Sequence, residues 1–232
     1  MTENVKPGLG LLQRAALKML MSRQSCWPLS EPAPTPSQLD VVLDAALRAP
    51  DHGQLRPWRF VLVRGEARHA LGEVFVQAAR ERDPDGDAER FRAKALAAPL
   101  IIAMGAHLQP GHKVPEGEQL LAVGAAAMNL LNALHILGYG GFWATGANSY
   151  DERVREALGF EPADRLVGFL YVGTPKEKRG DAPRPPRQRF VREWSSVEAT
   201  SAAGRHSIAG DSPQRTSIHS HSIVAGGLLL TS

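Results

Sequence analysis

The sequence has few of the residues that cross-link a fold or bind metals. Among its 232 residues, Cys26 is the one cysteine, which excludes an internal disulfide and a paired-cysteine zinc site. No HExxH occurs, and His107 and His112 have no acidic pair near them in sequence, so we expect no metal site. This cysteine content fits a reducing compartment, and we expect the protein to be cytoplasmic.

The common nucleotide-binding and hydrolase signatures are also missing. No GxGxxG lies between a predicted strand and a helix, and neither GxxxxGKS nor GxxxxGKT occurs. GxSxG is absent too, although a Ser-His-Asp site of another kind stays open. No single short motif therefore assigns an activity.

Neither charge nor hydropathy points to a nucleic acid or a membrane. The 27 basic and 24 acidic residues give a net charge of +3, without the clustered excess of a nucleic-acid-binding surface. Residues 1–10 lack the apolar segment of a signal peptide. The apolar stretch 120–137 is interrupted by Asn129, Asn132 and His135, which favours a buried helix. We expect a soluble protein with no nucleic-acid or membrane partner.

Periodicity and turn residues predict an α+β domain over 11–194, between a flexible N-terminus, 1–10, and a disordered tail, 195–232. Helical patterns cover 11–21, 66–80, 118–137 and 151–158, and the capping-box residues Thr35-Pro36-Ser37-Gln38 begin another helix. Apolar runs predict strands at 58–63, 99–106, 141–145 and 166–172. Residues 28–36 are predicted to form a Pro-rich connector.

Three polar or glycine-rich segments are candidates for a ligand site. The loop 48–58 carries arginines and a histidine between two prolines, which suits either a stiff ligand-binding loop or a solvated connector. Arg23 and Ser25 suit a phosphate, although an arginine at a helix C-terminus is often simply solvated. Residues 138–146 hold four glycines around Trp143, which favours close approach of a ligand or a tight turn.

Taken in order, the segments resemble the nitroreductase family of flavoenzymes, most closely its compact YdjA-like branch, over about residues 11–194. The matching segments are Ser-Arg-Gln-Ser at 22–25, Glu-Pro-Ala-Pro-Thr at 31–35, Arg-Ala-Pro-Asp-His at 48–52, Arg-Pro-Trp-Arg-Phe at 56–60, Ala-Pro-Leu-Ile-Ile at 98–102, His-Lys-Val-Pro at 112–115, Gly-Gly-Phe-Trp at 140–143 and Val-Gly-Phe-Leu-Tyr-Val-Gly-Thr-Pro at 167–175. The resemblance implies a nitroreductase-like fold, with a central, mainly antiparallel sheet of four to five strands flanked by helices, in an intertwined homodimer.

The resemblance also implies two FMN molecules at the dimer interface, each touched by both chains. The residues implied to bind FMN are Arg23, Gln24, Ser25, Trp143, Ala144 and Thr145 of one chain, with Arg48 and His52 supplied by the second chain. Ala133 is implied to contact the nicotinamide of NAD(P)H.

Two departures from the family pattern stand out. Related proteins often have a basic residue where this chain has Ala144, which leaves the charge near the flavin open. Many also place a basic C-terminal residue on the phosphate, for which Arg184, Arg187 and Arg189 are candidates.

The implied activity is that of an FMN-dependent NAD(P)H oxidoreductase. It would transfer two electrons in ping-pong order from NAD(P)H through FMN to a nitroaromatic, a quinone or a similar acceptor. Because the flavin carries the chemistry at N5, no catalytic side chain is expected. A non-catalytic FMN storage or sensor protein is the first alternative. A basic interaction module built on 179–192, with salt-dependent binding of an anionic polymer, is the second.

Overall fold

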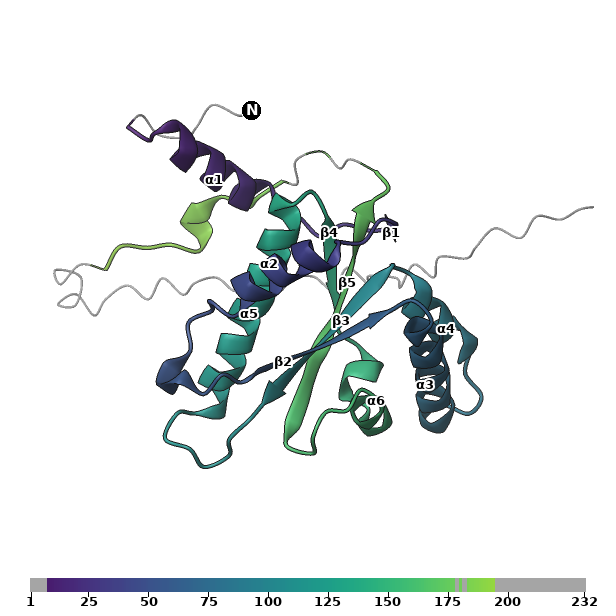
Figure 1. Cartoon of the computed structure of the whole chain (residues 1–232). Coiled ribbons are helices and arrows are strands. Elements are labelled where there is room, and N and C mark those ends of the chain that lie inside the picture. Colours follow the sequence, from purple (N-terminus) through teal and green to yellow (C-terminus); the bar gives the residue numbers. More distant parts are fainter. Residues whose placement is uncertain (1–7, 178–179, 181–182, 195–232) are drawn as a thin grey trace, which may run out of the picture. The chain divides into compact units, whose positions relative to one another are not determined.

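The computed structural model describes residues 8–177, 180 and 183–194 of the chain (Figure 1). The chain divides into two units, Met1–Pro183 and Arg184–Ser232. The first contains the helices and the sheet, and the described part of the second contains a 3₁₀ turn, Arg187–Arg189. The expected disordered tail, 195–232, lies outside the described residues, as do residues 1–7 of the N-terminus expected to be flexible over 1–10.

The core of the first unit is an antiparallel sheet of five strands, as expected. Four strands follow one another in the order β1 (Leu29–Ser30), β5 (Asp164–Pro175), β3 (Leu100–His107) and β2 (Trp58–Arg64). The fifth strand, β4 (Gly140–Ala144), also pairs with β5. Overlapping stretches of β5 pair with β3 and with β4, so β5 lies between these two strands. β5 is thus the strand on which the sheet is assembled.

Helices cover both faces of this sheet. Helices α2 (Pro36–Ala46) and α5 (Glu116–Ile136) lie on one face, and α3 (Ala67–Arg82), α4 (Glu89–Leu96) and α6 (Glu152–Ala157) on the other (Figure 1). Side chains alternate along each strand, so Leu170 of β5 packs under α2 and α5 while its neighbour Phe169 packs under α3 and α6. Both faces of the central strands are therefore buried.

Helix α2 begins as its sequence predicts. The Thr35 hydroxyl accepts from the Gln38 amide at 3.4 Å, and the Gln38 side chain accepts from the Thr35 amide at 2.9 Å. This reciprocal pair and Pro36 in the first turn confirm the predicted capping box. Leu39, Val42 and Ala46 of the predicted apolar stripe are buried.

Two elements fall where the sequence predicts none. β1 forms inside the supposed Pro-rich connector, because Leu29 and Ser30 pair with the end of β5. Helix α4 has one buried residue, Ala95, and no side-chain cap, so it has little of the apolar periodicity on which a helix is predicted. Helix α4 packs against α3.

Helices α1 (Leu11–Ser22) and α5 differ in how much they bury. Among the described residues, α5 is the one helix long and apolar enough to cross a membrane, with a mean hydropathy of 1.4. It buries eight residues against the sheet, as the sequence predicts for a core helix. α1 buries none, although it carries an apolar face.

Candidate functional site

The end of β4 is built around an indole that lies against β5. The Nε1 of Trp143 donates to the carbonyl oxygen of Val167 at 3.3 Å, beside a register shift between β3 and β5. Gly168 has φ +137°, and a Cβ at this position would lie 2.5 Å from Trp143 Nε1. Glycine at 168 is therefore what allows Trp143 to sit here.

The segment Arg23–Ser25 reaches this strand from α1. Directly after it, the Cys26 amide donates to the Gly141 carbonyl at 3.2 Å, two residues before Trp143. The Gln24 side chain donates to the Gly180 carbonyl at 3.0 Å. The structure thus brings the predicted residues 23–25 and 143–145, far apart in sequence, to the same edge of the sheet.

A cavity of about 250 Å³ opens beside the end of β4. Ala144 and Thr145 line it, together with Lys94 of α4 and the 3₁₀ turn Ala147–Tyr150. Its remaining walls are aromatic and consist of Trp27, Phe75, Phe91, Phe142, Phe169 and Tyr171. An apolar, aromatic recess with a few polar groups is typical of a site for a flat organic ring.

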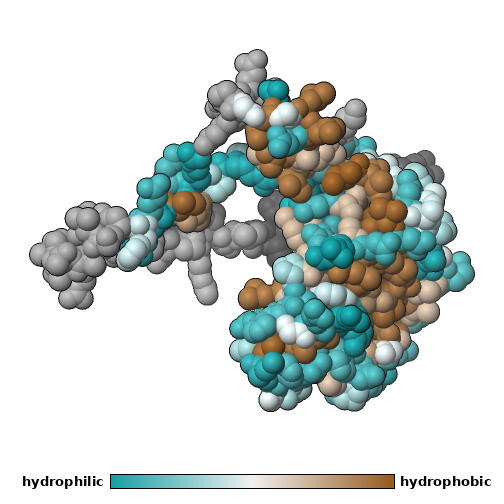
Figure 2. All heavy atoms as spheres, turned by 60° about the vertical axis from the view of Figure 1, so that its left-hand side comes forward, coloured by the Kyte–Doolittle hydropathy of each residue, from teal (hydrophilic) through white to brown (hydrophobic). Residues whose placement is uncertain are grey.

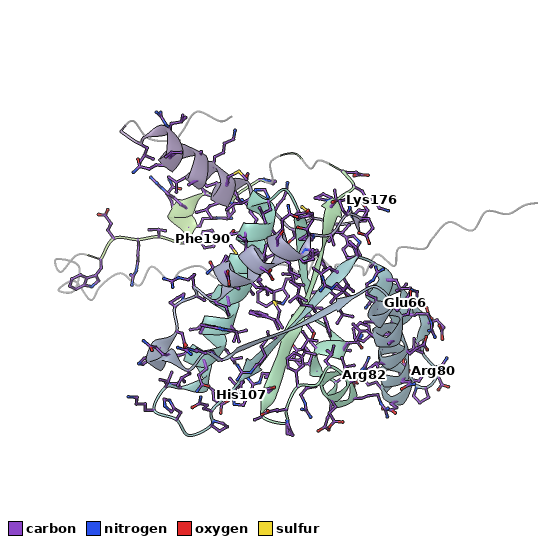
Figure 3. The ribbon with its side chains drawn as sticks, viewed as in Figure 1. Glu66, Arg80, Arg82, His107, Lys176 and Phe190 are labelled. Atoms are coloured by element: carbon purple, nitrogen blue, oxygen red, sulfur yellow. The ribbon has the colours of Figure 1, made fainter. Side chains whose placement is uncertain are left out.

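The turn Ala147–Tyr150 that closes this cavity is pinned by Arg82. Arg82 forms an ion pair with Asp151 and donates to the Asn148 side chain at 2.8 Å. Figure 3 shows Arg82 between the lower ends of α3 and α6. The wall is therefore held by a charged, hydrogen-bonded contact from α3.

Two polar side chains of the cavity were not predicted from the sequence. Partial burial, followed by repulsion from Arg90 and Arg82, lowers the pKa of the Lys94 ammonium. Burial raises the pKa of the Tyr171 phenol to about 12, so it stays protonated at neutral pH. Neither residue stands out in the sequence, because only the packing of α4 and β5 places both beside Ala144.

The loop that follows Arg48 reaches the other end of α5 at His52. His52 Nδ1 is 2.6 Å from the carboxylate of Glu118 in the first turn of α5, and both side chains are largely exposed. The Arg23 segment instead adjoins His135 in the last turn, where Ser22 Oγ is 2.9 Å from His135 Nε2. Glu118 and His135 are about 25 Å apart along the helix axis, at 1.5 Å per residue.

The predicted residues therefore form two separate groups within one chain. Ala133, two residues before His135, is half-buried against the core and belongs to the Arg23 end of α5. Arg184, Arg187 and Arg189 belong to the second unit.

An antiparallel sheet of this topology, covered by helices on both faces and bordered by an aromatic cavity, defines an α+β domain. The sequence model described as "Nitroreductase family" matches residues 20–174. The chain belongs to this family, which confirms the resemblance recognised in its sequence.

A sequence relative and two solved structures illustrate the similarity. A protein of Escherichia coli K12, named "Putative NAD(P)H nitroreductase YdjA", is 42% identical over 164 residues, which cover 70% of this chain and 90% of the relative. A nitroreductase-like family protein from Bacillus cereus superimposes with a TM-score of 0.68 at 21% identity, covering 77% of this chain and 95% of that one. A variant of the FMN- and NADPH-dependent nitroreductase NfnB from Sphigopyxis sp. strain HMH gives 0.65 at 19% identity, covering 78% and 99%. The two structures confirm the nitroreductase-like fold.

Proposed function

We propose that the protein is an FMN-dependent NAD(P)H oxidoreductase that reduces a nitroaromatic, a quinone or a similar acceptor in ping-pong order. Support comes from family membership, from the printed names of the relatives and from the aromatic cavity at the end of β4. When bound, FMN supplies the ring that takes two electrons from NAD(P)H and passes them on to the acceptor. The chain's own residues hold that ring and exclude water from it.

The cavity carries the proposal because its shape and lining fit an isoalloxazine. Its volume of about 250 Å³ lies just below the usual range for ligand sites, about 300–1,000 Å³, which suits one fused ring system and not a whole nucleotide. Ala144 and Thr145 border it at a strand end, where backbone groups can meet the ring edge. Lys94 adds a cation where negative charge on a reduced ring would be stabilised.

The phosphate end is assigned to the segment that follows α1. A guanidinium presents a fork of donors that matches phosphate oxygens, and the Ser25 hydroxyl adds a donor. We therefore assign Arg23, Gln24 and Ser25 to the phosphate and ribityl end, and Trp143, Ala144 and Thr145 to the ring.

Arg48 and His52 are assigned to the FMN site of a second copy of the chain. His52 lies at the end of α5 remote from Arg23, so one chain does not bring these two side chains to one cofactor. A homodimer in which α5 packs against its counterpart joins them.

The outer surfaces of α1 and α5 support this homodimer. Leu11 and Leu12 of α1 are 80% and 85% exposed, and Leu121 of α5 is 73% exposed. Gly124, in the middle of α5, has nothing within 4 Å of its Cβ position. Figure 2 brings the side of α1, α2 and α5 forward and shows hydrophobic residues on it. A glycine and an exposed leucine on α5, with two exposed leucines on α1, suit close packing against a second copy.

The remaining assignments also follow the family. Ala133, near the Arg23 end of α5, is assigned to the nicotinamide contact. The cytoplasm is the proposed location.

A non-catalytic FMN storage or sensor protein is the second candidate. Ala144, half-buried and without charge, lines the cavity where related proteins often have a basic residue. This candidate predicts bound FMN that NAD(P)H reduces slowly or not at all.

The two functions are separated by the visible spectrum of the purified protein, followed by anaerobic addition of NADH or NADPH. Flavin bands that bleach within seconds support the reductase. Bands that persist favour storage or sensing, and no flavin after reconstitution with FMN would reject both.

A further inference from the structure

Tyr171 occupies the floor of the aromatic cavity. It lies in the middle of β5, paired with Ile101 of β3 and Phe142 of β4, and is 5% exposed. Its ring meets Trp27 edge-on, with centroids 5.6 Å apart and planes at 88°. The position of the ring is therefore fixed by the sheet and by an aromatic neighbour.

The Tyr171 hydroxyl has no hydrogen-bond partner among the residues that the structure describes. The other two tyrosines of the chain differ from it. Tyr139 donates to the Gln38 side chain at 2.8 Å, and Tyr150 is 83% exposed. Tyr171 lines the cavity, so its unpaired hydroxyl is available to a bound ligand.

The surroundings of the hydroxyl favour the role of a donor. Most of the cavity wall is aromatic, and its other polar side chains are those of Lys94, Thr145, Asn148 and Ser149. Because burial raises the phenol's pKa to about 12, the group carries its proton throughout the physiological range. Lys94, on the same cavity, also donates only. An occupant with carbonyl oxygens would complement both groups.

We propose that Tyr171 is a cofactor-contacting residue whose hydroxyl donates a hydrogen bond to a polar edge atom of the flavin ring. The inference rests on the proposed function, in that it takes the occupant of the cavity to be the isoalloxazine. It assigns Tyr171 to the ring and not to the phosphate, which separates its role from that of Arg23.

The test compares two probes on the full-length protein, FMN and lumiflavin, which has the ring system without the ribityl phosphate. Tyr171→Phe keeps the aromatic packing and removes the hydroxyl. We expect the dissociation constants of both probes to rise by the same factor, about 3- to 10-fold for one neutral hydrogen bond. Arg23→Ala should weaken FMN binding and leave lumiflavin unchanged. Tyr150→Phe, which changes the exposed last residue of the turn Ala147–Tyr150, should change neither dissociation constant.

A second measurement, on flavin-free protein, separates a ligand contact from a structural one. Because the hydroxyl has no partner among the described residues, Tyr171→Phe should unfold at the same urea concentration as wild type or at a higher one. Tyr139→Phe loses its bond to Gln38 and should unfold at a lower concentration. A loss of stability in Tyr171→Phe as large as that in Tyr139→Phe would overturn the inference.

The inference would also be overturned if Tyr171→Phe bound both FMN and lumiflavin as tightly as wild type. Weaker binding of FMN with unchanged binding of lumiflavin would overturn it too. A wild-type protein that binds neither probe would reject the proposed function and this inference together. If wild type binds both probes but Tyr171→Phe does not weaken both, the inference fails and the proposed function stands.

Discussion

The hydroxyl of Ser22 and Nε2 of His135 lie 2.9 Å apart and join the last turn of α1 to the last turn of α5. This contact positions the chain just before Arg23. Burial, and after it the charge of Arg23, lowers the pKa of His135, so the folded protein favours the neutral imidazole.

This environment makes stability depend on pH. Because the unfolded chain binds the proton at a higher pH than the folded one, the free energy of unfolding should decrease as pH falls below about 6.5, by at most about 1.4 kcal/mol per pH unit. His135→Gln should remove this dependence. Urea unfolding of flavin-free protein between pH 5 and 7.5 measures it, and parallel curves for variant and wild type would contradict the expectation.

Gly168→Ala should disrupt the end of β4. The new Cβ would lie 2.5 Å from Trp143 Nε1 and 2.7 Å from the Ala144 carbonyl oxygen, at a φ that L-residues rarely adopt. We expect a loss of about 2 kcal/mol or more in unfolding free energy, together with weaker FMN binding. Gly117→Ala, which has nothing within 4 Å of its Cβ, is the matched control and should be nearly neutral. Equal stability of the two variants would show that β4 yields easily.

The sequence predicts those parts of the fold whose signals are local. The capping box at Thr35 and the apolar run of β3 specify their elements directly, and the structure confirms both. Helix α4 escapes prediction because half of its residues are charged and it buries one residue. The sequence therefore gives no reason to select Lys94.

The candidate site is predicted less completely than the fold. Motif resemblance identifies Arg23 and Trp143, which the structure places at one sheet edge. Tyr171 lies within an ordinary apolar strand, and only the cavity over β5 singles it out. Local patterns do not encode a cavity formed between α4, β4 and β5.

Lys94→Met should make bound FMN harder to reduce. Removing a cation from the rim of the cavity withdraws stabilisation from the negative charge of the reduced ring. We expect a reduction potential lower by roughly 30 mV, equivalent to about 1.4 kcal/mol for a two-electron couple. Spectroelectrochemical titration measures it. Arg90→Met, which removes a second cation over the Phe91 ring that does not line the cavity, is the control, and equal shifts in both variants would assign no specific role to Lys94.

Leu121→Lys should separate the proposed homodimer. The side chain is 73% exposed, so its replacement should change the stability of a single chain by about 0.5 kcal/mol or less. A charge buried between two α5 helices would oppose association, and loss of the dimer should release FMN. Leu96→Lys on α4, at the opposite face of the sheet, is the control. In sedimentation experiments, Leu121→Lys should be a monomer, and Leu96→Lys and wild type should be dimers. A dimeric Leu121→Lys variant would place the interface elsewhere.

Mixed dimers test directly whether Arg23 and His52 of different copies share one FMN. Arg23→Ala and His52→Ala should each weaken FMN binding at both sites of a homodimer. In a heterodimer of the two variants, one site carries both substitutions and the other carries neither. Co-expression with two affinity tags, followed by tandem purification, should therefore yield one tightly bound FMN per dimer, measured as flavin absorbance per protein.

Heterodimers that bind FMN no better than the parent variants would show that the two residues serve one site of the same chain, or that one of them serves none. Because Glu118 and His135 mark positions about 25 Å apart on α5, restored binding is the outcome that the geometry of a single chain supports.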